Sequence, residues 1–172
     1  MRQRPQDAAP RPPAALVLTT WEHLVAFGFG AGLAPKGPGT LGTLWGLPLF
    51  WLLALLPPAA YALITVALFG FGVWVCGRSA RLLGLHDTPG IVFDEIVGFL
   101  IAAAPLHPTL GLAQSAWWLV AAFALFRFFD IVKPPPIRWL DQRVHGGIGI
   151  MLDDLVAAAF AAIILVMLLT LI

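Results

Sequence analysis

Three long stretches of the chain contain no charged residue, and they set the pattern of hydrophobic and polar positions. They cover residues 37–77, 96–126 and 155–172, which are 41, 31 and 18 residues long. A helix that crosses a bilayer needs about 20 apolar residues. The pattern therefore predicts an integral membrane protein.

Prolines divide these stretches into five apolar segments. Pro57-Pro58 breaks the first stretch and the segment 105–111 breaks the second, because proline interrupts a helix and restricts the residue before it. We therefore predict an all-α membrane bundle with about four full spans, one short helix that enters the membrane, and a Gly/Pro-rich cytoplasmic loop. The expected helices cover residues 40–56, 59–77, 91–104, 112–129 and 155–172.

The N-terminal region has a different character. Residues 1–15 are rich in proline and arginine, which predicts a disordered tail ahead of a single membrane domain at 16–172. Thr19 and Glu22 have the spacing of a capping box, followed by an apolar face that predicts a short helix on the membrane surface. His23 would then lie at the membrane interface.

Composition supports the membrane class and excludes others. Charged residues make up 11% of the chain, against about 25% in soluble domains, and 60% of residues are hydrophobic. The formal net charge of +1 gives no basic excess for nucleic acid, and the single Cys76 excludes an intrachain disulfide or a zinc site built from thiolates.

The positions of the cations predict an orientation. With the N-terminus in the cytoplasm, all ten Lys and Arg residues fall in the inner segments 1–39, 78–95 and 127–154. All nine acidic residues fall there as well. One polar face should therefore collect every charged group at the cytoplasmic leaflet.

Two pairs of adjacent acids are candidates for a metal site. Asp94 and Glu95 begin one apolar segment, and Asp153 and Asp154 follow a Gly-rich turn before the last one. Adjacent carboxylates repel unless a cation joins them, which favours a metal. The alternatives are solvated acids at a helix start for the first pair and an ordinary N-cap for one member of the second pair.

A third motif combines cations with an acid. Arg127, Asp130 and Lys133 are spaced i, i+3, i+6, so a helix that ends at the triple proline 134–136 would place them on one broad face. Such a face could hold a metal ligand between two phosphate-binding cations. For Arg138 and Arg143, an anchor on the cytoplasmic side is the simpler reading.

The Gly/Pro-rich loop is a candidate phosphate site. Backbone N–H groups around Gly39 that lead into a helix could cradle a phosphate, with Lys36 and Thr40 adding side-chain donors. Pro38 stands where a P-loop would need lysine, and no strand precedes the loop as a dinucleotide fold requires.

Taken together, the four motifs resemble the phosphatidylglycerophosphatase A family. They run in order through most of residues 27–164 as PKGPGTLGTL, IVFDEIVG, FRFFDIVKPPPIRWLD and HGGIGIMLDD. The resemblance implies a Mg²⁺-dependent enzyme of the bacterial inner membrane that hydrolyses phosphatidylglycerophosphate, a lipid substrate, to phosphatidylglycerol and phosphate at the cytoplasmic face.

The resemblance also implies roles for individual residues. Mg²⁺ favours oxygen ligands, and metal-activated water is the expected nucleophile, with a phospho-aspartate intermediate left open. Asp87, His86 or His145 would carry protons. The expected metal ligands are Asp94, Glu95, Asp130, Asp153 and Asp154; the catalytic set is Asp94, Glu95, Asp130, Asp154 and Asp87; and the phosphate-binding set is Lys36, Gly39, Thr40, Arg127 and Lys133.

Two other classes stay open at this point. A secondary transporter or cation channel could use the acids at the membrane edge, although such proteins tend to place ionisable groups within the membrane. A lipid-binding scaffold would need the cations but not the convergent carboxylates.

Overall fold

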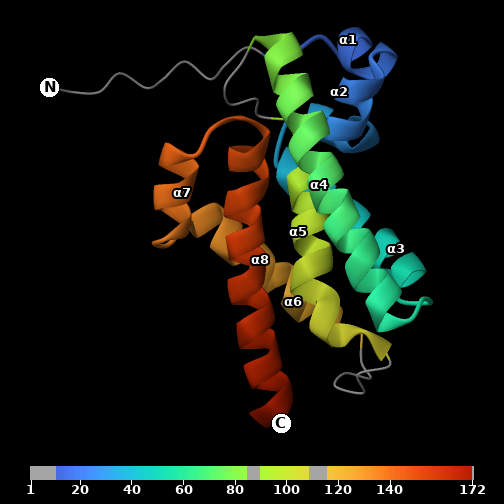
Figure 1. Ribbon diagram of the computed structural model, residues 1–172, viewed down its shortest axis with the longest axis vertical. Helices are drawn as coiled ribbons and strands as arrows, with labels where there is room; N and C mark the ends of the chain where they lie inside the picture. Colours follow the sequence, from blue (N-terminus) through green and yellow to red (C-terminus); the bar gives the residue numbers. More distant parts are fainter. Residues whose placement is uncertain (1–10, 85–89, 109–115, 172) are drawn as a thin grey trace, which may run out of the picture.

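The computed structural model of the protein describes residues 11–84, 90–108 and 116–171, and all secondary-structure elements in these residues are helices. Figure 1 shows the arrangement. The elements are α1 (Ala14–Thr19), α2 (Trp21–Ala26), η1 (Gly28–Leu33), α3 (Pro38–Leu53), α4 (Pro58–Leu83), α5 (Phe93–Ala103), η2 (Ala104–Leu106), α6 (Trp117–Val132), α7 (Ile137–Arg143) and α8 (Gly146–Leu171).

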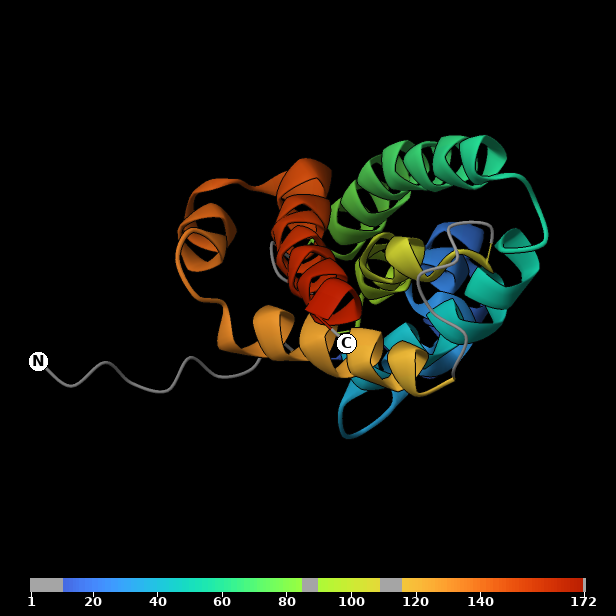
Figure 2. The ribbon, with the colours of Figure 1, turned by 90° about the horizontal axis from the view of Figure 1, so that it is seen from below.

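Helix α5 is the centre of the bundle. It packs against α3, α4, α6 and α8, and Figure 2 shows these four helices around it. Its residues are apolar on every side after the first turn, and Phe99, Leu100, Ala102 and Ala103 are fully buried. A helix that is hydrophobic all round is stable only inside a packed structure. The short apolar segment predicted at 91–104 is therefore the core helix.

Helices α4 and α8 cross at very close range. A Cβ atom added to Gly147 would lie 1.8 Å from the backbone oxygen of Val73, so no side chain larger than hydrogen fits there. Because residue 147 has no side chain, the two backbones come close enough to make the dispersion contacts that stabilise this crossing. The crossing fixes the first turn of α8 against the middle of α4, and it sets the position of everything that α8 carries.

Two of the described helices, α4 and α8, are long and apolar enough to cross a membrane. Helices α3 and α6 have 16 residues each, which gives a length of about 24 Å against the roughly 30 Å of a bilayer core. The four full spans predicted from the pattern are therefore not confirmed.

The last helix begins much earlier than the pattern predicts. Helix α8 starts at Gly146, not at residue 155, and the Gly-rich segment 146–149 belongs to its first turn. The predicted N-cap role for Asp153 or Asp154 is therefore wrong, since both residues lie about two turns inside the helix.

The predicted capping box at Thr19 and Glu22 is also wrong. The Thr19 hydroxyl donates to the Ala15 carbonyl oxygen (2.7 Å), and Thr20 precedes α2 with no side-chain cap. The Glu22 carboxylate pairs instead with Arg78 on α4. His23 is buried against Ser79 and does not lie at an exposed interface.

Residues 1–10 of the predicted tail lie outside the described part of the chain. Within the predicted 1–15 segment, Arg11 donates hydrogen bonds to the carbonyl oxygens of Ala34 (3.1 Å) and Pro35 (3.0 Å), and α1 begins at Ala14.

The charged side chains gather toward one end of the bundle. The start of α5, the end of α6, helix α7 and the first turns of α8 lie near one another, and the C-terminal end of α8 points away from them (Figure 1). The apolar half of the bundle positions this polar end, because the same helices continue into both.

Candidate active site

Asp94 and Glu95 lie in the first turn of α5, as the sequence predicts. The backbone N–H of Glu95 donates to Asp94 Oδ1 (3.1 Å). The positive end of the helix dipole stabilises negative charge at this position. Helix α5 therefore presents two carboxylates from the buried centre of the fold.

The Asp153 and Asp154 side chains leave α8 in two directions. Successive residues on a helix are about 100° apart, so the two neighbouring carboxylates leave the helix in different directions. Asp154 is buried and joins Asp94 and Glu95, and one oxygen from each of the three residues lies within 4.8 Å of the others. Asp153, also buried, faces Lys133 instead.

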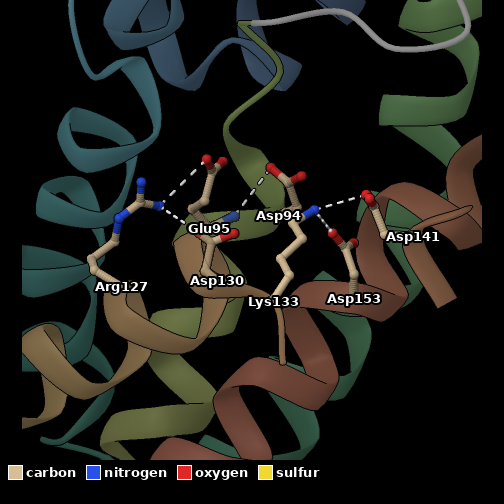
Figure 3. A network of polar contacts seen from close by, with 7 residues as sticks. All are labelled: Asp94, Glu95, Arg127, Asp130, Lys133, Asp141 and Asp153. Carbon is tan, nitrogen blue, oxygen red and sulfur yellow. Dashed lines mark hydrogen bonds and ion pairs between the residues drawn. The ribbon is translucent and has the colours of Figure 1, made fainter. Parts of the chain in front are cut away.

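Arg127 lies on the opposite side of Glu95 from Asp94 (Figure 3). Its Nη1 contacts Asp130 Oδ2, one turn along α6, and lies 3.6 Å from Glu95 Oε1. The two residues at i, i+3 on α6 thus form an ion pair. Arg127 connects α6 to the carboxylates of α5.

Lys133 connects three helices, and Figure 3 shows it between Asp94 and the pair of Asp153 and Asp141. It ends α6 in a left-handed conformation (φ 46°), which turns the chain toward the prolines. Its ammonium group lies 2.5 Å from Asp153 Oδ2 on α8 and 2.7 Å from Asp141 Oδ1 on α7. Burial lowers the pKa of Lys133, but the hydrogen bonds to Asp141 and Asp153 outweigh it, so the pKa is raised and the group stays charged.

These groups line one cavity of about 590 Å³. Six carboxylates and two cations meet in and beside it, namely Asp94, Glu95, Asp130, Asp141, Asp153 and Asp154 with Arg127 and Lys133. Among the described residues, three buried side-chain atoms here have no hydrogen-bond partner: Glu95 Oε2, Asp154 Oδ2 and Arg127 Nε. Buried polar atoms are normally paired, so these three atoms retain hydrogen-bonding capacity for a ligand.

Gly39 forms the wall of the cavity next to Glu95. A Cβ atom on Gly39 would lie 2.0 Å from Glu95 Oε1 and 3.1 Å from Arg127 Nη1. The first turn of α3 can approach this carboxylate only because residue 39 has no side chain.

The structure brings most of the predicted site residues together. Those that line the cavity are Gly39, Asp94, Glu95, Asp130, Lys133, Asp153 and Asp154, and Arg127 contacts two of them. Lys36 is exposed, and neither Lys36 nor Thr40 lines the cavity. His86 and Asp87 lie outside the described residues, whereas His145 lines the cavity.

Asp141 and Gln142 line the cavity but have no role in the sequence-based prediction. They follow the triple proline in a short helix, and polar or charged residues in such a helix are typical of a solvated surface. Their position depends on α7 folding back against α8. The sequence spacing of Lys133 and Asp141 does not indicate that their side chains meet.

Known proteins resemble this chain over most of its length. The family model for Phosphatidylglycerophosphatase A matches residues 24–169. The Phosphatidylglycerophosphatase A of Escherichia coli K12 is 43% identical over 144 residues, covering 83% of this chain and 80% of the relative. That of Haemophilus influenzae Rd is 45% identical over 144 residues, covering 83% and 85%.

No solved structure matches the chain. The family match spans all the helices that build the cavity, and identity above 40% extends over most of both relatives. The chain therefore belongs to the phosphatidylglycerophosphatase A family and is a phosphatase.

Proposed function

We propose that this protein hydrolyses the terminal phosphate of phosphatidylglycerophosphate, with Mg²⁺, at the cytoplasmic face of a bacterial inner membrane. The family and the names of the relatives support the reaction. The observation that carries the assignment of the site is the convergence of Asp94, Glu95 and Asp154 beside two cations in one cavity.

The donor set fits a hard divalent cation. Asp94, Glu95 and Asp154 offer only oxygen, which Mg²⁺ prefers, and they would hold the ion. Two of the three have a buried oxygen that lacks a hydrogen-bond partner. Asp130 and Asp153, which the sequence adds to the ligand set, are bound to Arg127 and Lys133.

A bound Mg²⁺ supplies Lewis acidity and neutralises charge on the phosphoryl oxygens. The remaining work belongs to the side chains of this chain. Arg127 and Lys133 flank the carboxylates and would bind the other phosphate oxygens through charge-assisted hydrogen bonds. Both are already held by acids, so their head groups are oriented before substrate arrives.

Burial of the carboxylates explains why the site needs a cation. Asp154 is 3% exposed, and its repulsion by nearby Glu95 and Asp94 is weakly screened at such a depth. Phosphate, which is also anionic, would be repelled by an unneutralised cluster. The proposal therefore predicts ordered binding, with the cation required for productive association of the lipid headgroup.

The distribution of charge supports a multi-pass chain with the cavity on the cytoplasmic side. All ten Lys and Arg residues lie in segments assigned to that side. A cysteine placed at position 142 in a Cys76→Ser background should react with an impermeant maleimide only after the inner membrane is opened. Labelling of intact spheroplasts from outside would contradict the orientation.

The reaction is tested with the purified full-length protein in detergent micelles. Phosphate release from phosphatidylglycerophosphate should require Mg²⁺, stop with EDTA and resume when Mg²⁺ is restored. Turnover that resists EDTA would contradict the proposed role of the metal. Absence of phosphate release would contradict the proposed reaction. Membership of a phosphatase family also leaves no support for the transporter or scaffold alternatives.

A further inference from the structure

The cavity is larger than the reacting phosphate needs. Its volume of about 590 Å³ corresponds to roughly 20 water volumes at ~30 Å³ each, whereas a phosphate group replaces only a few waters. The metal-binding carboxylates, with Arg127 and Lys133 beside them, form the part that we call the wall. Asp141 lies beyond Lys133 in Figure 3 and lines the cavity together with Gln142 and His145; we call these three residues the α7 rim.

The α7 rim is held in place from two sides. Ile137, at the start of α7, is fully buried in the main core cluster, and α7 packs against α8. At the other end of the helix, Asp141 binds the Lys133 ammonium group (2.7 Å). Figure 3 shows Asp141 and Arg127 at opposite ends of the row of polar side chains. Helix α7, and with it the Asp141 carboxylate, is therefore held beside the site.

The chemistry of the rim differs from that of the carboxylate wall. Its three residues offer a carboxylate acceptor, an amide that both donates and accepts, and an imidazole. These groups suit a hydroxyl group and a singly charged phosphodiester better than a second doubly charged phosphate. In phosphatidylglycerophosphate, a glycerol unit with a free hydroxyl group and then a phosphodiester lie between the terminal phosphate and the part that carries the acyl chains.

We infer that the α7 rim binds the glycerol-phosphodiester part of the lipid headgroup, while the carboxylate and cation wall binds the terminal phosphate. This inference rests on the proposed function. Gln142 is assigned as the main donor to the phosphodiester, Asp141 as an acceptor from the glycerol hydroxyl while it holds Lys133, and His145 as a second donor. The rim then determines which phosphorylated lipids are good substrates.

The two reaction products probe the two parts separately. Inorganic phosphate can bind only the wall, and phosphatidylglycerol carries the glycerol and phosphodiester without the terminal phosphate. Inhibition constants for both are measured against phosphatidylglycerophosphate turnover by the Mg²⁺-loaded, full-length protein. Phosphatidylcholine with the same acyl chains reports inhibition by the chains alone.

Gln142→Ala should raise the inhibition constant of phosphatidylglycerol roughly tenfold and leave that of phosphate unchanged. His145→Ala should act in the same direction, and His145→Gln should restore binding because the amide still donates. The matched control is Arg143→Ala, since Arg143 lies on α7 but stacks on the Trp139 ring and does not line the cavity. It should change neither constant.

The inference is wrong if Gln142→Ala changes both constants equally or neither of them. It is also wrong if His145→Gln loses turnover as fully as His145→Ala with unchanged phosphatidylglycerol binding, because His145 would then carry a proton and not recognise the lipid. Failure of the proposed function is a separate result, in which the wild-type protein releases no phosphate at all, and the inference falls with it.

Discussion

Two polar clusters within the described residues, both buried or partly buried, are built differently. Between α2 and α4, Glu22 pairs with Arg78 (2.9 Å) and His23 Nδ1 pairs with Ser79 Oγ (2.8 Å), so each group has a partner of matching chemistry. In the cavity, six carboxylates meet two cations, and three buried atoms have no hydrogen-bond partner.

The difference separates a structural cluster from a functional one. A satisfied cluster joins two helices without leaving a buried polar group unpaired, and it offers no vacant donor or acceptor to a ligand. An unsatisfied cluster of like charges destabilises the protein alone and is relieved by a cation or substrate. The unpaired carboxylates of the cavity break the local rules of charge pairing, which is the pattern expected of the proposed active site.

The largest expected effect comes from removing charge in the cavity. Asp94→Asn and Asp154→Asn should each reduce kcat/KM by a factor of roughly a thousand or more, since several kcal/mol of metal stabilisation is lost. Asp130→Asn should also lower kcat/KM, because Arg127 loses the carboxylate that orients it. Thermal stability without metal should hold or rise in Asp94→Asn and Asp154→Asn, because one repelling charge is gone. Phosphate-release assays and thermal melts measure the two effects.

The matched control for these variants is Glu22→Gln in the α2–α4 cluster. The same carboxylate-to-amide change there should lower the melting temperature, because Arg78 loses its partner, and leave kcat/KM unchanged, because neither Glu22 nor Arg78 lines the cavity. Activity that survives in the three Asp→Asn variants, or disappears in Glu22→Gln, would reverse the assignment of the two clusters.

Removing Mg²⁺ should abolish turnover in the same way and should also lower the stability of the wild-type protein. At an ion concentration 100 times Kd, binding adds about 2.7 kcal/mol to the free energy of unfolding. Melts with EDTA and with Mg²⁺ measure this difference. Glu22→Gln should keep the stabilisation by Mg²⁺, and Asp94→Asn and Asp154→Asn should lose it. If Mg²⁺ raised the melting temperature equally in all variants, the ion would bind elsewhere.

Lys133→Ala should have an intermediate effect. Loss of one charge-assisted contact to phosphate should lower kcat/KM by about 10- to 100-fold. The Mg²⁺-dependent rise in melting temperature should remain, since Asp94, Glu95 and Asp154 do not contact Lys133 in the described ion pairs. Complete loss of the Mg²⁺ effect would show that Lys133 holds the metal site together.

A smaller effect is expected when the satisfied cluster is broken. Ser79→Ala leaves buried His23 without its hydroxyl partner and should lower the free energy of unfolding by about 1–3 kcal/mol. Chemical or thermal unfolding in micelles measures this loss. Mg²⁺-dependent turnover at a temperature where the variant is folded should equal that of the wild type, and a selective loss of activity would contradict a purely structural role.

The smallest expected effect is a dependence of stability on pH in the same cluster. Burial lowers the pKa of His23, although Glu22 opposes the shift. The folded state therefore favours the neutral ring, and this contribution is fully present above a pH of about 6.5 and is lost as pH falls through the lowered pKa. Melts across this range should show a shallower acid loss in His23→Gln than in the wild type.

Part of the site was predictable because local chemistry determines it. Asp94 and Glu95 precede an uninterrupted apolar run, so they had to lie in the first turn of a helix. The i, i+3 spacing of Arg127 and Asp130 was enough to predict that they share one helix face, where they form an ion pair. The order of the four motifs was also sufficient to indicate the family, which the comparisons confirm.

Other features depended on contacts between distant segments. Asp153 and Asp154 resembled helix caps, but α8 begins at Gly146 because Gly147 packs against the backbone of Val73. His23 meets Ser79 only because α2 packs on α4, 56 residues further along the chain. Propensity and capping rules concern neighbours in sequence, and tertiary packing overrode them at both positions.

The sequence by itself determined the apolar segments, the placement of all charge in three segments, and the chemical types present at the site. Only the tertiary structure decided which carboxylates converge. Asp154 joins Asp94 and Glu95, while Asp153 binds Lys133 with Asp141. The physical reason is that adjacent helical residues point about 100° apart, so each carboxylate's partner depends on the helices packed around it.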